Sequence, residues 1–167
     1  GEKSWWAENL TLRWSRQDAL TSSQAPALAD VNNDGILDVI TGMYSEMSVL
    51  NSSNGQWINH FSSNTLSVHY GITVYDIDAD GHLELLTNDG DHDNHNYTDV
   101  YDLVTGQLKA QLPLGNYNST MPYDNKWAPL VADIYPNGNN PDGSPRMEII
   151  TGANTSRTTT YTSFPAC

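Results

Sequence analysis

The sequence predicts an all-β fold built from short antiparallel strands. Apolar, β-branched runs such as Val39-Ile40 and Ile149-Ile150 lie between turns rich in Gly, Asn and Asp. No apolar stripe with helical periodicity continues beyond a turn or two. A similar unit also occurs three times within the 167 residues, a length that suits one domain with a sizeable core.

Each copy of the unit begins with a strand that ends in Asp, followed by a polar loop and a second strand. The first strands are residues 25–30, 71–76 and 128–133, and the second strands are residues 38–42, 84–88 and 148–152. The leading Asp residues are 46 apart (76 − 30) and then 57 apart (133 − 76). These periods are close to the length of a four-stranded propeller blade, which is roughly 40 to 50 residues.

A second hairpin follows in the first two copies. It joins residues 48–50 to 56–61 in the first copy and residues 99–103 to 107–112 in the second. Each tight turn contains a glycine, Gly55 or Gly106, which accepts the positive φ that such turns require. We therefore expect blade-like repeats at about residues 12–62, 66–115 and 123–167, with all four strands in the first two and only the first hairpin in the third.

Three repeats are too few to close a propeller, which takes about four blades or more. The sequence therefore predicts an incomplete propeller, either part of a longer chain or completed by further copies. Residues 1–14 are expected to be a terminal extension or, through residues 10–14, the last strand of a preceding blade.

The charge of the chain indicates a cation as its partner. The 20 Asp and Glu residues against 7 Lys and Arg give a formal net charge of −13. That excess argues against nucleic acid and anionic membranes, which bind through basic patches, and no apolar run reaches the roughly 20 residues that span a bilayer. Because 5 Trp and 9 Tyr argue against disorder, the carboxylates are expected on a folded frame.

Two nine-residue loops share the pattern Asp-x-(Asp/Asn)-x-Asp-Gly-x-x-(Asp/Glu). Calcium prefers 6 to 8 hard oxygen ligands, which loops of this kind supply from positions 1, 3, 5 and 9 and from the carbonyl at position 7. Glycine at position 6 permits the sharp bend, and strands rather than helices flank both loops. A plain Asp-Gly turn is the alternative, but two loops with the same acid spacing favour calcium. The predicted ligands are Asp30, Asn32, Asp34, the Ile36 carbonyl and Asp38, and Asp76, Asp78, Asp80, the His82 carbonyl and Glu84.

The third loop departs from this pattern. Position 3 is Tyr135, whose phenol is a poor calcium ligand, and an insertion precedes the closing Glu148. Asp133, Asn137 and Glu148 are candidate ligands, with help from Asp142 or backbone carbonyls. A loop that has lost its metal is the equal alternative.

The segment Ala-Asp-Val-Asn-Asn-Asp-Gly-Ile-Leu-Asp-Val-Ile-Thr-Gly resembles the FG-GAP (VCBS-like) repeat of integrin α-subunit propellers and many secreted proteins. The resemblance extends over about residues 12–152. It implies loops on one face of a propeller that bind calcium for stability, with the ligands named above. Members of the family serve as adhesion domains, lectins and non-catalytic parts of enzymes, so the fold alone does not fix the function.

An extracellular location is expected, because millimolar calcium is found there. Five Asn-x-Ser/Thr sequons agree with it, at Asn9, Asn51, Asn96, Asn118 and Asn154. The single cysteine, Cys167, is then half of a disulfide with another chain, or otherwise an ordinary free thiol.

Other candidate sites are weaker. Residues 88–96 carry Asp89, Asp91 and Asp93 at the same spacing, together with His92 and His95, and are either a further metal site or a solvated loop. Aromatic side chains would suit a sugar platform but in blades mostly pack between sheets; the candidates are Trp5, Trp6, Trp57, Tyr117, Tyr123 and Trp127.

No catalytic motif is evident, so we expect a non-enzyme with a structural, adhesion or assembly role and a protein or glycan partner. The alternatives are a carbohydrate-binding propeller and a partial segment of a secreted polysaccharide-degrading enzyme. Further blades of the same chain or a homo-assembly would complete the ring.

Overall fold

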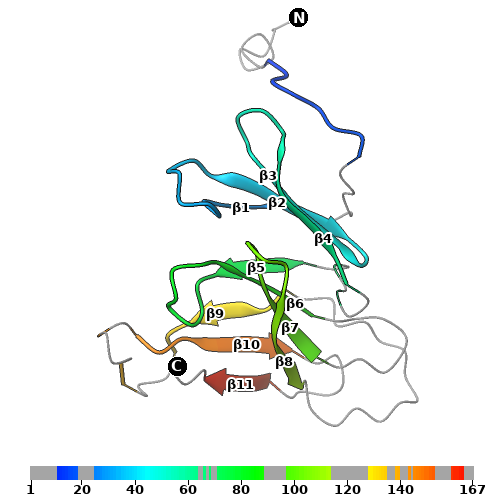
Figure 1. Ribbon diagram of the computed structural model, residues 1–167. Helices are drawn as coiled ribbons and strands as arrows, with labels where there is room; N and C mark the ends of the chain where they lie inside the picture. The colour runs from blue at the N-terminus through cyan, green and yellow to red at the C-terminus, as the bar shows by residue number, and fades with distance from the viewer. Residues whose placement is uncertain are drawn as a thin grey trace, which may run out of the picture.

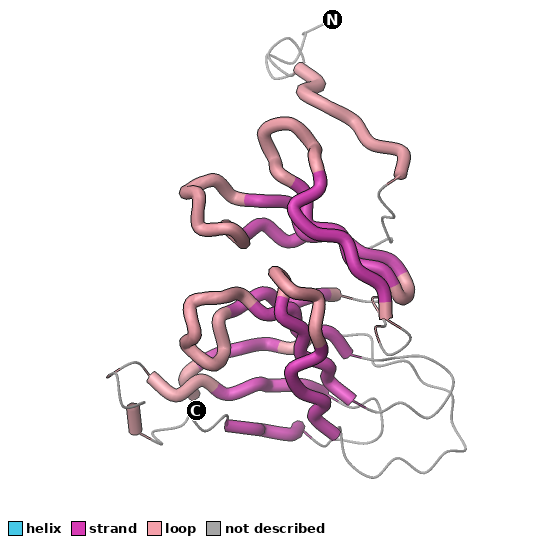
Figure 2. Tube along the Cα trace, in the orientation of Figure 1, coloured by secondary structure: helices cyan, strands magenta, loops and turns pink. Residues whose placement is uncertain are grey.

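Three antiparallel sheets follow one another along the chain (Figures 1 and 2). The computed structural model describes residues 11–18, 25–63, 66, 68, 71–88, 97–113, 128–134, 138–139, 143, 145–152 and 159–163. All regular structure in these residues is β, which confirms the predicted fold class. Within the same residues no helix is long and apolar enough to cross a membrane.

Each sheet is a meander, in which consecutive strands are neighbours. The first sheet contains β1 (Ala27–Ala29), β2 (Asp38–Met43), β3 (Glu46–Leu50) and β4 (Trp57–Ser62). The second contains β5 (Ile72–Tyr75), β6 (Glu84–Asn88), β7 (Tyr97–Asp102) and β8 (Leu108–Pro113). The third contains β9 (Leu130–Ala132), β10 (Glu148–Gly152) and β11 (Thr159–Ser163), of which β11 was not assigned from the sequence.

The first two sheets share their register, including one irregularity. In each, the strand before the polar loop pairs with the strand after it, so that Ala29 lies opposite Asp38 and Tyr75 opposite Glu84. The pairing of β3 with β4 and of β7 with β8 then slips by one residue near the turn, which is a β-bulge. The repeat visible in the sequence is therefore a repeat in hydrogen bonding as well.

The second sheet is buried on both faces, because it lies between the other two. Leu85 and Tyr101 pack into a core shared with Ile40 and Val49 of the first sheet. Leu86 and Val100, one residue away along the strands, pack instead against Ile149 of the third sheet. Successive side chains of a strand point to opposite faces, so one apolar strand serves both cores.

The first strands of the three sheets lie side by side, β1 next to β5 and β5 next to β9 (Figure 1). The Thr73 hydroxyl of β5 donates a hydrogen bond to the carbonyl of Pro129, just before β9. A Cβ added at Gly71 would come within 2.9 Å of the Ala128 Cβ, so this contact is close. The sheets therefore pack most tightly along one edge, as blades of a propeller do.

Aromatic rings cover the glycines of the two tight turns. Gly55 and Gly106 both have φ of +72°, as the turn predictions require. A Cβ at Gly55 would lie 2.6 Å from the Trp14 ring, and a Cβ at Gly106 would lie 2.7 Å from Phe61 of the preceding sheet. The same ring-on-glycine contact therefore joins Phe61 of the first sheet to the second sheet, and Trp14 to the first sheet.

The segment before the first sheet was expected to be a terminal extension or the last strand of a preceding blade. Residues 11–16 form no strand in the structure, and residues 1–10 lie outside the described part. Trp14 is nevertheless fixed on the turn, because its Nε1 donates a 2.7 Å hydrogen bond to the Ser52 carbonyl. The Arg16 guanidinium donates to the Gly55 carbonyl at 2.7 Å.

The covered turns give a first test by glycine substitution. We expect Gly106→Ala to lower the free energy of unfolding by roughly 2 to 4 kcal/mol, because the methyl group meets Phe61 and φ is positive. Gly143→Ala is the matched control, since Gly143 has φ of +88° and open space around it. That variant should lose only about 1 kcal/mol, and equal losses in urea unfolding would show that the ring contact contributes nothing.

Candidate metal centre

The two predicted loops have the same backbone shape. At position 6, Gly35 and Gly81 have φ of 82° and 88°, which confirms the predicted bend. At position 4, Asn33 and Ala79 also have positive φ, 57° and 58°. Asparagine tolerates this conformation but alanine seldom adopts it, so the positive φ at Ala79 was not predicted.

Side-chain oxygens of the loop hold this backbone in place. The carboxylate at position 1 accepts the amides of positions 5 and 6, and the carboxylate at position 5 accepts the amide of position 7. In the first loop these bonds are Asp34 N to Asp30 (3.0 Å), Gly35 N to Asp30 (2.8 Å) and Ile36 N to Asp34 (2.8 Å). In the second they are Asp80 N to Asp76 (3.1 Å), Gly81 N to Asp76 (3.0 Å) and His82 N to Asp80 (2.8 Å).

The acid that closes each loop is buried at the start of the second strand. Asp38 and Glu84 have no exposed surface, and Glu148 of the third loop is 3% exposed. One oxygen of each accepts the amide of position 2, and these bonds are Val31 N to Asp38 (3.1 Å), Ile77 N to Glu84 (2.9 Å) and Ile134 N to Glu148 (2.9 Å). Three copies of one contact therefore clamp the base of the loops.

The other oxygen of the closing acid distinguishes the first loop. Asp38 Oδ1 is buried and has no hydrogen-bond partner among the described residues. Burial is the main cause that raises the pKa of Asp38, and the charges of Asp34 and Asp30 add to it, against the lowering effect of the Val31 amide. A buried carboxylate oxygen of this kind is costly unless a positive charge meets it.

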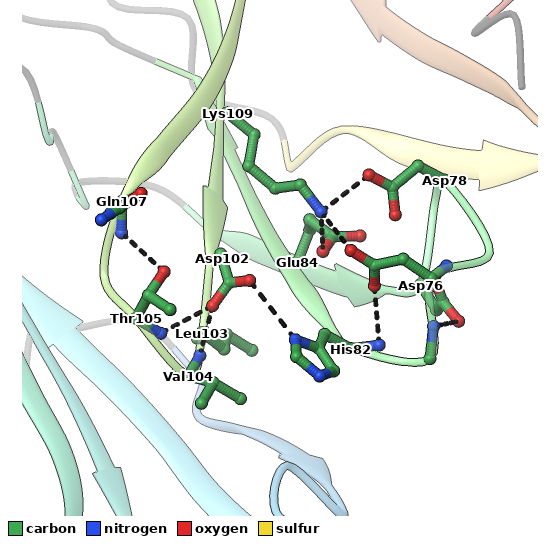
Figure 3. Close-up of polar contacts among 12 residues, drawn as sticks. Asp76, Asp78, His82, Glu84, Asp102, Leu103, Val104, Thr105, Gln107 and Lys109 are labelled. Atoms are coloured by element: carbon green, nitrogen blue, oxygen red, sulfur yellow. Dashed lines mark hydrogen bonds and ion pairs between the residues drawn. The ribbon is translucent and has the colours of Figure 1, made fainter. Parts of the chain in front are cut away.

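In the second loop a lysine side chain reaches the acids (Figure 3). Lys109 Nζ lies 2.7 Å from Asp78 Oδ2, 2.9 Å from Asp80 Oδ2 and 3.0 Å from Glu84 Oε1. Burial lowers the pKa of Lys109, but its bonds to the three carboxylates outweigh burial and raise it. The bond to Lys109 is the main cause that lowers the pKa of Asp80.

The acids of the second loop converge, and those of the first do not. Oxygens of Asp76, Asp78 and Glu84 all lie within 4.8 Å of one another, a grouping that could hold a metal ion. Among the described residues the acids of the first loop form no such group; its position 3 is the amide Asn32, which accepts Asp34 N at 3.0 Å. The two loops adjoin, since Asn33 Nδ2 lies 3.5 Å from the Gly81 carbonyl.

The donor set suits a hard cation. Carboxylate, amide and carbonyl oxygens are what calcium binds, and no thiolate is present among them. The His82 ring points to Asp102, with Nδ1 3.7 Å from Oδ2 (Figure 3). The His82 ring is therefore engaged with Asp102, and its carbonyl stays the predicted ligand.

The third loop keeps the hydrogen bond between position 2 and the closing acid, but its sequence departs from the other two loops. Asp133 is exposed, and Asn137, Tyr135 and Asp142 lie outside the described residues. Within the insertion, Asn139 forms an isolated antiparallel bridge with Pro145 and donates its side-chain amide to the Gly143 carbonyl at 3.0 Å. Position 4 is Pro136, a residue whose ring excludes the positive φ that Asn33 and Ala79 adopt.

Most of the weaker candidates lie outside the described residues. These are residues 89–96, the aromatics Trp5, Trp6, Tyr117, Tyr123 and Trp127, Cys167, and every sequon asparagine except Asn51. Trp57 is described and half-buried, with its ring 4.7 Å from that of His60 and 4.2 Å from the Arg16 guanidinium carbon. Its ring is therefore already engaged within the chain.

The clamp of the third loop can be tested without any metal. We expect Glu148→Ala to lower the free energy of unfolding by about 1 to 3 kcal/mol, because the Ile134 amide loses a charged acceptor in a part-buried hydrogen bond. Glu148→Gln keeps an acceptor oxygen and should lose clearly less. If urea unfolding in EDTA gave the same loss for both variants, the charge rather than the hydrogen bond would be the important property.

Comparison with known proteins supports the repeat. Residues 30–87 match the family model described as an FG-GAP-like repeat, from the first acid of the first loop to β6. The crystal structure of the V. cholerae biofilm matrix protein Bap1 is similar, with 22% identity and a TM-score of 0.46, over 71% of this chain and 17% of that one. No curated protein matches the chain significantly. The resemblance read from the sequence is confirmed by the family model: this chain contains an FG-GAP-like repeat.

Proposed function

We propose that this chain is a calcium-binding segment of an extracellular β-propeller with a structural, adhesion or assembly role. The observation that carries the proposal is the buried Asp38 oxygen, which has no hydrogen-bond partner in the described part of the chain and lies at the base of a loop lined with oxygen donors. The same loop shape in two repeats supports it, because chance rarely duplicates both acid spacing and backbone.

In the first loop Asp30, Asn32, Asp34, the Ile36 carbonyl and Asp38 would hold the ion. Calcium supplies the positive charge that the carboxylates lack. Asp30 and Asp34 already fix the loop through backbone amides, so the loop needs little reordering before it binds. Asp38 anchors the site to β2, which ties the binding energy to the fold.

The charge of the chain fits this role, and calcium levels outside cells fit the proposed location. A net charge of −13 disfavours anionic partners and is reduced by each bound ion. Extracellular modules bind calcium with dissociation constants of about 10⁻⁴ to 10⁻³ M, which match the calcium level outside cells. The carbohydrate-binding alternative gains nothing from Trp57, since its ring contacts Arg16 and His60.

Metal removal tests the proposal directly. At calcium concentrations near one hundred times Kd, binding should add about 2.7 kcal/mol and raise Tm by roughly 5 to 10 °C relative to excess EDTA. Magnesium at the same concentration is the control, because it prefers a smaller octahedral site. Superimposable melting curves in EDTA and at that calcium concentration would contradict calcium binding.

We expect the effect of Asp38→Asn on stability to depend on whether calcium is present. In EDTA we expect no loss of stability, because an amide can still accept the Val31 N–H and no longer buries a charge. In calcium the variant should lack most of the rise in Tm that calcium binding at the first loop gives the wild type. Asp102→Asn is the control. Asp102 lies opposite Glu84, and the first repeat has Asn51 at the equivalent position. Calcium should still raise the Tm of this variant in the same differential scanning calorimetry experiment.

A further inference from the structure

Lys109 occupies a special place in its strand. In the pairing of β7 with β8, Tyr101 lies opposite Leu108 and Val100 opposite Ala110, so Lys109 is the extra residue of the bulge. In the first repeat, Leu50 lies opposite Trp57 and Val49 opposite Asn59, and Ile58 is the extra residue. Bulges redirect a side chain, and the two repeats place different residues at this position.

Ile58 contributes to the core, whereas Lys109 contacts the acids. Ile58 is half-buried and packs against the cluster shared by the first two sheets. The Lys109 ammonium instead contacts the side chains at positions 3, 5 and 9 of the second loop, three of the five predicted calcium ligands. Its side chain is 26% exposed and that of Glu84 is fully buried, so this ion-pair network is more than a surface contact.

The lysine also equalises the charge of the two loops. The second loop has four carboxylates (Asp76, Asp78, Asp80 and Glu84), and one ammonium reduces their formal charge from −4 to −3. The first loop has three carboxylates (Asp30, Asp34 and Asp38), a formal charge of −3, with the neutral Asn32 at position 3. The extra acid of the second loop, Asp78, is the residue closest to Lys109 Nζ, at 2.7 Å.

We propose that Lys109 is a tethered cation that holds the second loop together without calcium and competes with calcium for that loop. This inference rests on the proposed function. The ammonium and the ion share Asp78, Asp80 and Glu84 as ligands, so calcium enters only when Nζ leaves these oxygens. The second loop is therefore the weaker calcium site, and the second repeat stays folded when calcium is absent. The first loop, which no lysine of the described residues contacts, is the one that responds to calcium.

Calcium titration of the second loop alone tests the competition. Asp38→Asn removes the first site. Lys109→Ile is then added in the same chain, because the first repeat carries isoleucine at this position. We expect calcium affinity, measured by isothermal titration calorimetry, to rise about tenfold or more when the ammonium is removed. Lys109→Met is the second variant if the isoleucine disturbs the bulge, and Lys109→Arg, which keeps the charge, should leave affinity low. Unchanged affinity in both apolar variants would overturn the proposal.

Melting in EDTA tests the holding role separately. Lys109→Ile and Lys109→Met should melt several degrees below wild type in EDTA, because four carboxylates then face one another. Calcium should restore both variants to the wild-type range. A Tm that is unchanged in EDTA would overturn the holding role. Absence of calcium binding by wild type and by every variant would overturn the proposed function and the competition, whereas the EDTA melts would still decide whether Lys109 holds the loop.

Discussion

The buried acid at the end of each polar loop is the constraint on which the rest of the structure depends. Asp38, Glu84 and Glu148 lie at the start of the second strand, where each accepts the amide of position 2 and so fixes how the loop leaves the first strand. Burying a carboxylate away from solvent costs free energy. One backbone amide forms a hydrogen bond with one of its oxygens, and the second oxygen needs a further hydrogen-bond donor or cation.

Two repeats of one chain meet that requirement differently. In the first, Asp38 Oδ1 has no partner among the described residues, which is the ground for the proposed calcium ion. In the second, Lys109 reaches Glu84 from a bulge in β8. A family motif that is nearly identical in the two loops therefore need not give equal metal sites, because the charge that enters the loop comes from a strand outside the motif. The third repeat retains the clamp.

The contacts between repeats show why one repeat would not be stable alone. The second sheet buries apolar side chains on both faces, and each tight turn is covered by an aromatic ring from the segment before it. The ring on Gly106 comes from the first sheet, and the ring on Gly55 comes from Trp14. Stability of this kind is shared between neighbours, as in other repeat architectures, so a local change in one turn affects two sheets.

The sequence by itself determined the strands, the turns and the acids of the loops. These features are local: alternating apolar residues define strands, glycine permits positive φ, and the spacing places the acids within one nine-residue loop. The sequence left open whether residues 10–14 form a strand, and it did not predict the shape at Ala79 or β11, because these depend on distant partners. Only the tertiary structure decided that Lys109 enters the second loop and Ile58 the core, because a bulge 25 residues beyond Glu84 (109 − 84) sets the direction of the side chain and pattern alone cannot show it.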